Sequence, residues 1–127
     1  MRRILLALIA VMVGACSEPD PRYLIQPQKW NDIVIEVESR PTPIRPGMNE
    51  FLVIATLEHG KPVPDLIVSL RAEPNDEWQQ AIQDGYSGVY RRALRLPGTP
   101  NLYVQLQKKM SDEKVVLEFP LVYGGKQ

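Results

Sequence analysis

The sequence alternates apolar and polar residues over six short stretches, and no other feature constrains its fold as strongly. The stretches follow residue 31 and are separated by turns rich in glycine, proline, asparagine and aspartate. Such alternation is typical of strands with one buried face, and six of them at nearly even spacing predict a small all-β sandwich of six to seven antiparallel strands. Pro120 lacks an amide hydrogen, so the last strand is expected at a sheet edge. The apolar sets expected in the core are Ile33, Ile35 and Val37; Phe51, Val53, Ala55 and Leu57; Leu66, Val68, Leu70 and Ala72; Tyr90, Leu94 and Leu96; Leu102, Val104 and Leu106; and Val115, Leu117, Phe119 and Leu121.

The segment from residue 74 to residue 85 departs from this alternation. Asn75 is a residue type that caps helices, and two acidic residues follow it where they would favour a helix N-terminus. Trp78 and Ile82 are four residues apart and would face the core together from a helix. We therefore expect a short helical turn here, with an irregular loop as the alternative.

The first fifteen residues have the composition of an export signal. Arg2 and Arg3 precede a run of ten apolar residues, and small residues follow the run. A short basic segment, an apolar core and a small-residue cleavage site are typical of a secretory signal peptide. A membrane-spanning helix needs about 20 apolar residues, so the run is too short to be one. Residues 1–15 are therefore expected to be removed on export.

Cys16 is the single cysteine of the chain, and it directly follows Val13, Gly14 and Ala15. This stretch resembles the bacterial lipobox, in which a cysteine after small residues is lipidated and becomes the mature N-terminus. The resemblance implies that Cys16 carries several acyl chains, palmitate among them, and two or more chains give stable membrane attachment. The alternative is an ordinary signal cut that leaves a free thiol. Ser17, in place of an aspartate, favours the outer membrane, facing the periplasm, in a host with two membranes.

The mature chain is expected to consist of a tether and one domain. Residues 16–30 contain three prolines, which favour extended backbone, so we expect a semi-rigid tether before a domain of residues 31–127. Removal of residues 1–15 takes away two of the 15 basic residues and none of the 15 acidic ones. The near-neutral charge that remains argues against nucleic-acid binding, which needs a concentrated basic face.

Three motifs at turns point to a known group of domains. They are Pro46-Gly47-Met48-Asn49, Gly60-Lys61-Pro62-Val63 and Gly88-Val89-Tyr90, each next to an expected strand. In this order, over roughly residues 30–123, the chain resembles the YtkA-like and FixH-like domains of bacterial envelope proteins. The resemblance implies an immunoglobulin-like β-sandwich. It also raises the possibility of a metal site, because relatives of this group are linked to copper handling and to the assembly of respiratory oxidases.

Soft metal ligands are few in the mature chain. Cuprous copper prefers thioether, thiolate and imidazole ligands, and only His59, Met48 and Met110 offer them besides Cys16. Met48 and His59 flank a strand of about ten residues, which at about 3.3 Å per residue places them at opposite ends of the sandwich. We therefore expect no bound metal and no cofactor.

The sequence also contains no recognisable set of catalytic residues. The chain has one histidine and no Gly-x-Ser-x-Gly turn to hold a nucleophilic serine. The carboxylates of Glu36 and Glu38 fall on the polar side of an expected strand, where charged residues ordinarily face water. We predict no catalytic residue.

Arg71, Arg91 and Arg95 fall on the outward sides of expected strands. Guanidinium groups bind carboxylates and phosphates with two parallel hydrogen bonds, so these residues are candidates for contact with a partner. The alternative is that they pair with glutamates of neighbouring strands, such as Glu36, Glu38 or Glu73.

The sequence thus favours a membrane-tethered envelope lipoprotein with a non-catalytic β-sandwich that contacts another envelope protein. The leading alternative is a YtkA-like periplasmic protein that handles copper or assists respiratory oxidase assembly. A module that accompanies a hydrolase is a more distant alternative.

Overall fold

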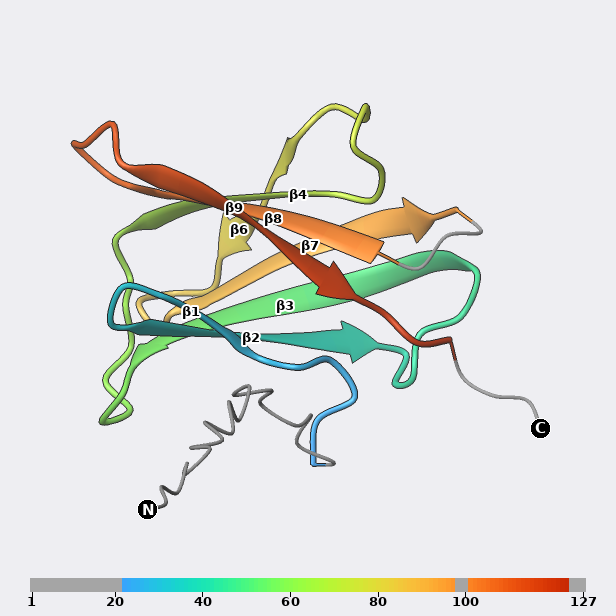
Figure 1. Ribbon diagram of the computed structural model, residues 1–127, viewed down its shortest axis with the longest axis horizontal. Helices are drawn as coiled ribbons and strands as arrows, with labels where there is room; N and C mark the ends of the chain where they lie inside the picture. The colour runs from blue at the N-terminus through green and yellow to red at the C-terminus, as the bar shows by residue number, and fades with distance from the viewer. Residues whose placement is uncertain (1–21, 98–100, 124–127) are drawn as a thin grey trace, which may run out of the picture.

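The computed structural model describes residues 22–97 and 101–123, which form an all-β sandwich of two sheets (Figure 1). Sheet I has the strand order β1-β2-β3-β7-β6, and sheet II has the order β5-β4-β8-β9. Neighbouring strands in both sheets are antiparallel. This part of the chain contains no helix, and so none long and apolar enough to cross a membrane. The strands are β1 Gln28–Trp30, β2 Ile33–Arg40, β3 Gly47–Leu57, β4 Leu66–Arg71, β5 Gln79–Gln80, β6 Ile82–Gln83, β7 Val89–Leu96, β8 Asn101–Lys108 and β9 Lys114–Pro120.

The predicted alternation is confirmed, and it produces a small immunoglobulin-like sandwich. The six expected strands are β2, β3, β4, β7, β8 and β9, and their apolar sets meet between the sheets. Leu57, Val115 and Leu117 are only partly buried at the margin of this core, while the rest of the predicted sets are buried. β9 is an edge strand of sheet II and ends at Pro120, as its missing amide hydrogen predicts.

The predicted helical turn between residues 74 and 85 is wrong. The segment instead holds two very short strands, and the chain changes sheets between them: β5 pairs with β4 in sheet II, and β6 pairs with β7 in sheet I. At the crossing point the Ala81 amide donates to the Val68 carbonyl over 2.7 Å. The backbone groups of this segment therefore find hydrogen-bond partners in β4 and β7. A helix of one or two turns, which is costly to nucleate, does not form.

The two side chains expected to face the core from that helix lie elsewhere. Ile82 is 70% exposed on the outer side of sheet I, and Ala81 is buried in its place. The ring of Trp78 lies over the Arg71 guanidinium, with 4.0 Å from its centroid to Cζ. A spacing of four residues did not indicate a shared buried face, because the chain changes from sheet II to sheet I between Trp78 and Ile82.

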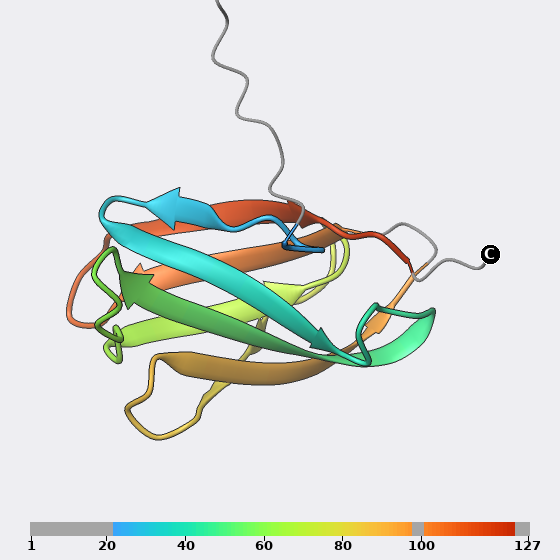
Figure 2. The same cartoon turned by 90° about the horizontal axis from the view of Figure 1, so that it is seen from below.

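The domain begins earlier than residue 31. β1 pairs with β2, and Ile25 before it is buried in the core. β1 also lies beside β9, the edge strand of the other sheet (Figure 2). The Gln28 side chain donates to the Glu118 carbonyl over 2.6 Å, and the Asn31 side chain donates to the Glu113 carboxylate over 3.1 Å. Residues 25–30 of the expected tether are thus part of the sandwich and fasten its two sheets together.

Two of the three turn motifs pack against each other. Gly88 has a φ of +77°, and a Cβ there would lie 2.6 Å from the Ala55 carbonyl oxygen. Two residues later the buried Tyr90 hydroxyl donates to the Val63 carbonyl over 2.8 Å and accepts from the Leu66 amide over 3.3 Å. Burial raises the pKa of this Tyr90 hydroxyl, which remains neutral and able to donate. The second and third motifs therefore form one joint between β7 and the β3–β4 turn.

The first motif closes the turn into β3. Asn49 is buried, and its side-chain amide donates to the carbonyls of Arg45 and Gly47 over 2.7 and 3.1 Å. Its side-chain oxygen accepts from the Arg45 amide over 3.2 Å. One asparagine thus satisfies three backbone groups that a turn would otherwise leave without partners.

Candidate functional site

The change of sheets between β5 and β6 leaves part of β7 open. On one side β3 pairs with β7 over its whole length, from Val89 to Leu96. On the other side β6 pairs with only Tyr90 and Arg91. Within the described residues, no strand pairs with residues 92–96 on that side. An open strand edge presents backbone donors and acceptors that can pair with another chain.

A groove of about 650 Å³ lies beside this open edge, on the outer side of sheet I. Met48 of β3, Ile82 of β6 and Ala93 of β7 give it an apolar lining. Met48 is 58% exposed and Ile82 is 70% exposed, which is unusual for large apolar side chains so close together. The groove therefore combines apolar surface with unpaired backbone.

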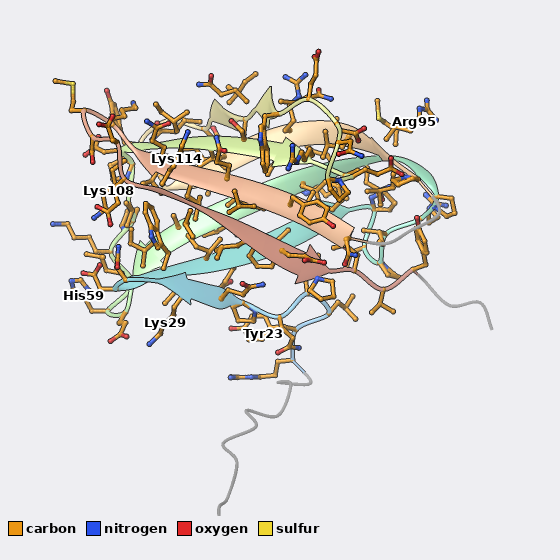
Figure 3. The ribbon with its side chains drawn as sticks, turned by 45° about the horizontal axis from the view of Figure 1, so that its top comes forward. Tyr23, Lys29, His59, Arg95, Lys108 and Lys114 are labelled. Atoms are coloured by element: carbon orange, nitrogen blue, oxygen red, sulfur yellow. The ribbon has the colours of Figure 1, made fainter. Side chains whose placement is uncertain are left out.

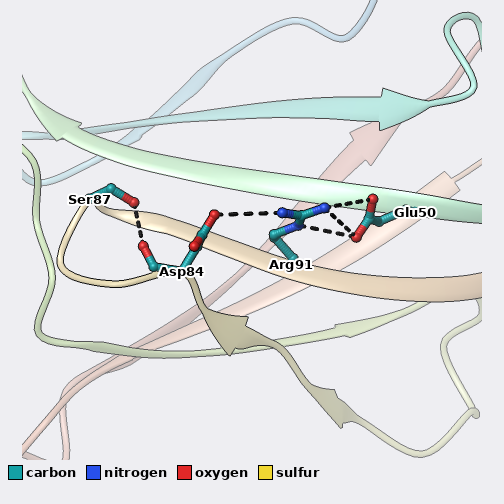
Figure 4. Close-up of polar contacts among 4 residues, drawn as sticks. All are labelled: Glu50, Asp84, Ser87 and Arg91. Carbon is teal, nitrogen blue, oxygen red and sulfur yellow. Dashed lines mark hydrogen bonds and ion pairs between the residues drawn. The ribbon is translucent and has the colours of Figure 1, made fainter.

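Arg91 is one of the residues that line the groove, and it is held by two carboxylates (Figure 4). Its Nε donates to Glu50 Oε2 over 3.1 Å, and its Nη2 donates to Glu50 Oε1 over 3.2 Å. Asp84 Oδ2 lies 3.6 Å from Nη1, and the Ser87 hydroxyl donates to the Asp84 carbonyl over 2.6 Å. The partners of Arg91 are therefore Glu50 and Asp84, and not the glutamates expected from the sequence. Because this network is partly exposed, it fixes the orientation of Arg91 more than it stabilises the fold.

Arg92 points from β7 toward the crossing segment. Its Nε and Nη2 donate to the Gln79 side-chain oxygen over 3.2 and 2.6 Å, and its Nη1 donates to the Gln80 carbonyl over 3.5 Å. Arg92 thus bridges the two sheets where no strand joins them. These bonds keep the crossing segment on sheet II and away from the open part of β7.

Arg95 lies further along β7 and differs from Arg91 and Arg92. It is exposed, it lies opposite Met48 of β3, and it projects from the end of the sandwich (Figure 3). No acidic partner for it is found among the described residues. Arg95 does not line the groove itself, and its charge is available to a ligand that continues along β7 beyond Ala93.

The three arginines predicted as partner contacts do not form one cluster. Arg91 and Arg95 share the outer side of sheet I, whereas Arg71 lies at the end of β4 on sheet II. Arg71 Nη1 donates to the Asp76 carbonyl over 3.2 Å, and its guanidinium stacks on Trp78. These contacts hold the loop between β4 and β5, and Arg71 does not line the groove.

The three soft metal ligands come from different places in the fold. Met48 lies near the start of β3, and His59 lies in the turn after that strand ends, at the opposite end of the sandwich from Arg95 (Figure 3). Met110 is fully exposed in the turn after β8. Among the described residues, no three His, Cys, Asp or Glu side chains come together as a metal site would require. The predicted separation of Met48 from His59 is confirmed.

The predicted export signal and Cys16 lie outside the described residues. The open edge of β7 and the carboxylates that hold Arg91 were not predicted, since both depend on how distant strands pair. The one local indication of the groove in the sequence was the apolar residue Ile82. It was predicted to face the core, whereas the structure exposes it beside the sheet crossing.

The fold and its groove define the class of this protein: a small antiparallel β-sandwich with an open strand edge. Comparisons with protein-family models, with curated proteins and with solved structures found no match to this chain.

Proposed function

We propose that this protein is a membrane-tethered lipoprotein of the bacterial cell envelope whose β-sandwich is a non-catalytic interaction module. The observation that carries the proposal is the single Cys16, directly after an apolar export signal and small residues. Nine residues further on, Ile25 is already packed in the core. At about 3.3–3.6 Å per residue, the link from Cys16 to the domain reaches about 30 Å at most. The sandwich would therefore stay close to its membrane.

The groove beside β7 supports a role through protein contacts. It joins exposed apolar side chains, a fixed guanidinium and unpaired strand backbone, and these features suit a polypeptide ligand. Among the described residues, Glu50 and Asp84 of the groove are both paired with Arg91, and Arg92 is bound to Gln79. The one histidine of the chain, His59, lies outside the groove, in the turn after β3. A partner in the same envelope compartment is the proposed ligand.

Replacing Cys16 with alanine is expected to release an intact domain from the membrane. Loss of the acyl chains removes about 0.8 kcal/mol of membrane affinity per buried methylene, and the stretch from Cys16 to Ile25 is much shorter than the about 20 apolar residues that a spanning helix needs. Membrane fractionation of both forms measures the release, and mass spectrometry of the natural protein measures the acyl chains at its N-terminus. An unmodified Cys16, or cleavage at another residue, would refute the anchor.

The copper-handling alternative leads to a different expectation. Because Met48 and His59 lie at opposite ends of the domain, at most two of the three soft ligands can meet at one place. We therefore expect a soluble Cys16→Ala form to show no stoichiometric cuprous binding when titrated against a competing chelator. Stoichiometric binding that disappears in a His59→Ala variant would favour the YtkA-like copper function instead.

A further inference from the structure

We propose that the open edge of β7 binds an extended acidic segment of a partner protein, which adds a strand to sheet I. This inference rests on the proposed interaction function and names the surface and the ligand. The open edge begins at the first residue of β6, Ile82, because Gln80 just before it turns away to pair with Ser69 of sheet II. The position that the residues before Ile82 would occupy in a longer β6 is not filled by a strand of the described residues, and the groove lies there.

The register of β6 indicates what an added strand would meet. Ile82 lies opposite Arg91, so the next outward positions of a strand on the same line lie opposite Ala93 and Arg95. Ala93 is small and exposed, and the side chain opposite it would enter the groove between Met48 and Ile82. An aliphatic residue fits that position.

The position opposite Arg95 determines the charge of the ligand. Directly opposite side chains on paired antiparallel strands have Cβ atoms about 4.5–5.5 Å apart, within reach of a guanidinium–carboxylate pair. Arg91 is already held by Glu50 and Asp84, and Arg92 by Gln79, whereas Arg95 has no acidic partner among the described residues. A glutamate or aspartate two residues from the aliphatic side chain would therefore complete the contact.

Other occupants fit this edge less well. A second copy of the chain would place two Arg95 side chains on the same face of a joint sheet, and like charges there are destabilising. A membrane surface is a less suitable ligand, because the tether leads into β1 and the open edge of β7 lies beside β6, at the opposite edge of sheet I. The stretch from Ser17 to Pro21 is acidic, but the described residues that follow it lead into β1, at the edge of sheet I opposite β6.

The test uses the full chain in detergent micelles and a labelled probe peptide, Thr-Val-Thr-Glu-Thr-Val-Thr-Glu-Thr. Fluorescence anisotropy measures affinity, and hydrogen exchange reports which backbone amides become protected. We expect saturable binding, with protection of residues 92–96. A peptide with lysine in place of both glutamates should bind about tenfold more weakly, because it meets the Arg95 charge with a like charge.

Two variants locate the site, and a third is the matched control. Arg95→Glu should weaken binding of the acidic peptide about tenfold, and Ile82→Asn about fivefold through lost apolar contact. Lys114→Glu makes the same change in net charge on β9, an edge of the other sheet, and should leave the affinity unchanged. Both positions on sheet I are exposed, so the fold should persist.

Three results would overturn the inference: equal weakening by Arg95→Glu and Lys114→Glu, protection of β9 in place of residues 92–96, or no saturable binding. The anchor is tested separately, since the peptide contact needs no acyl chain. An unmodified Cys16 would refute the anchor and leave the binding result standing, and absent peptide binding would leave the anchor standing.

Discussion

Replacing Gly88 with alanine is expected to destabilise the domain by about 2–5 kcal/mol, from backbone strain and overpacking together. The added Cβ would lie 2.6 Å from the Ala55 carbonyl oxygen and 3.1 Å from both Pro62 Cβ and the Val63 nitrogen. These neighbours cannot move away freely. The Ala55 amide donates to the Gly88 carbonyl over 2.9 Å, and the Ala55 carbonyl accepts from the Val63 amide over 3.0 Å. Relief of the clash would therefore break the joint between β3, β7 and the β3–β4 turn.

Gly85 provides the matched control for that substitution. Its φ is +65°, similar to that of Gly88, but a Cβ there would have nothing within 4 Å. Gly85→Ala should therefore cost only the backbone strain of a left-handed residue, about 1–2 kcal/mol. Urea unfolding of both variants in the soluble Cys16→Ala background measures how much free energy of unfolding each one loses. Equal losses would show that close packing at Gly88 contributes nothing.

Replacing Phe119 with alanine is expected to cost about 3–5 kcal/mol of unfolding free energy. Phe119 is 0% exposed and lies opposite Leu102 of β8, in the middle of the core. The domain is small, and 5–15 kcal/mol is about the total stability of a typical domain. The variant should therefore show a large loss of stability by urea unfolding, in the same background.

Val116 of the same strand is the control for Phe119. Its side chain points to the outer side of sheet II and is 49% exposed. Val116→Ala should change the stability by less than about 1 kcal/mol, since little apolar surface is uncovered. If the two substitutions had similar effects, the inward and outward faces of β9 would be assigned incorrectly, because a shift of one residue exchanges them.

The six main strands could be predicted from the sequence because their signal is local. Each strand buries one side, so its apolar residues recur at every second position, and Ile33, Ile35 and Val37 of β2 are an example. The edge position of β9 was also predictable, since Pro120 cannot donate to a further strand. Such features depend on residues that are near one another in the chain.

The change of sheets could not be predicted, because its cause lies in other strands. Ala81 and Gln80 are held by Val68 and Ser69 of β4, and the next residue, Ile82, is held by β7. Nothing between residues 74 and 85 shows that two different sheets supply its hydrogen bonds. The spacing of Trp78 and Ile82 was therefore interpreted as a short helix.

The candidate site was only partly predictable for the same reason. Arg91 and Arg95 could be placed on an outward strand face, but the order β3-β7-β6 brings Glu50 and Asp84 to Arg91. Within this order, β3 and β7 pair although they are far apart in the chain. The three-residue strand β1 was missed because so short a stretch carries no clear period.

The fastening of β1 to β9 determines how an anchored domain would respond to mechanical load. With the chain held at Cys16, as we propose, a pull on the domain passes through Ile25 and reaches β1 first. β1 is three residues long, whereas β2 behind it is eight residues long, so β1 yields before the central strands do. Release of residues 25–32 would free a segment whose full extended length is about 26 Å, at about 3.3 Å per residue. The side-chain hydrogen bonds of Gln28 and Asn31 to β9 and its preceding turn would then set the force at which β1 detaches. The groove lies at the opposite edge of sheet I and would keep its shape.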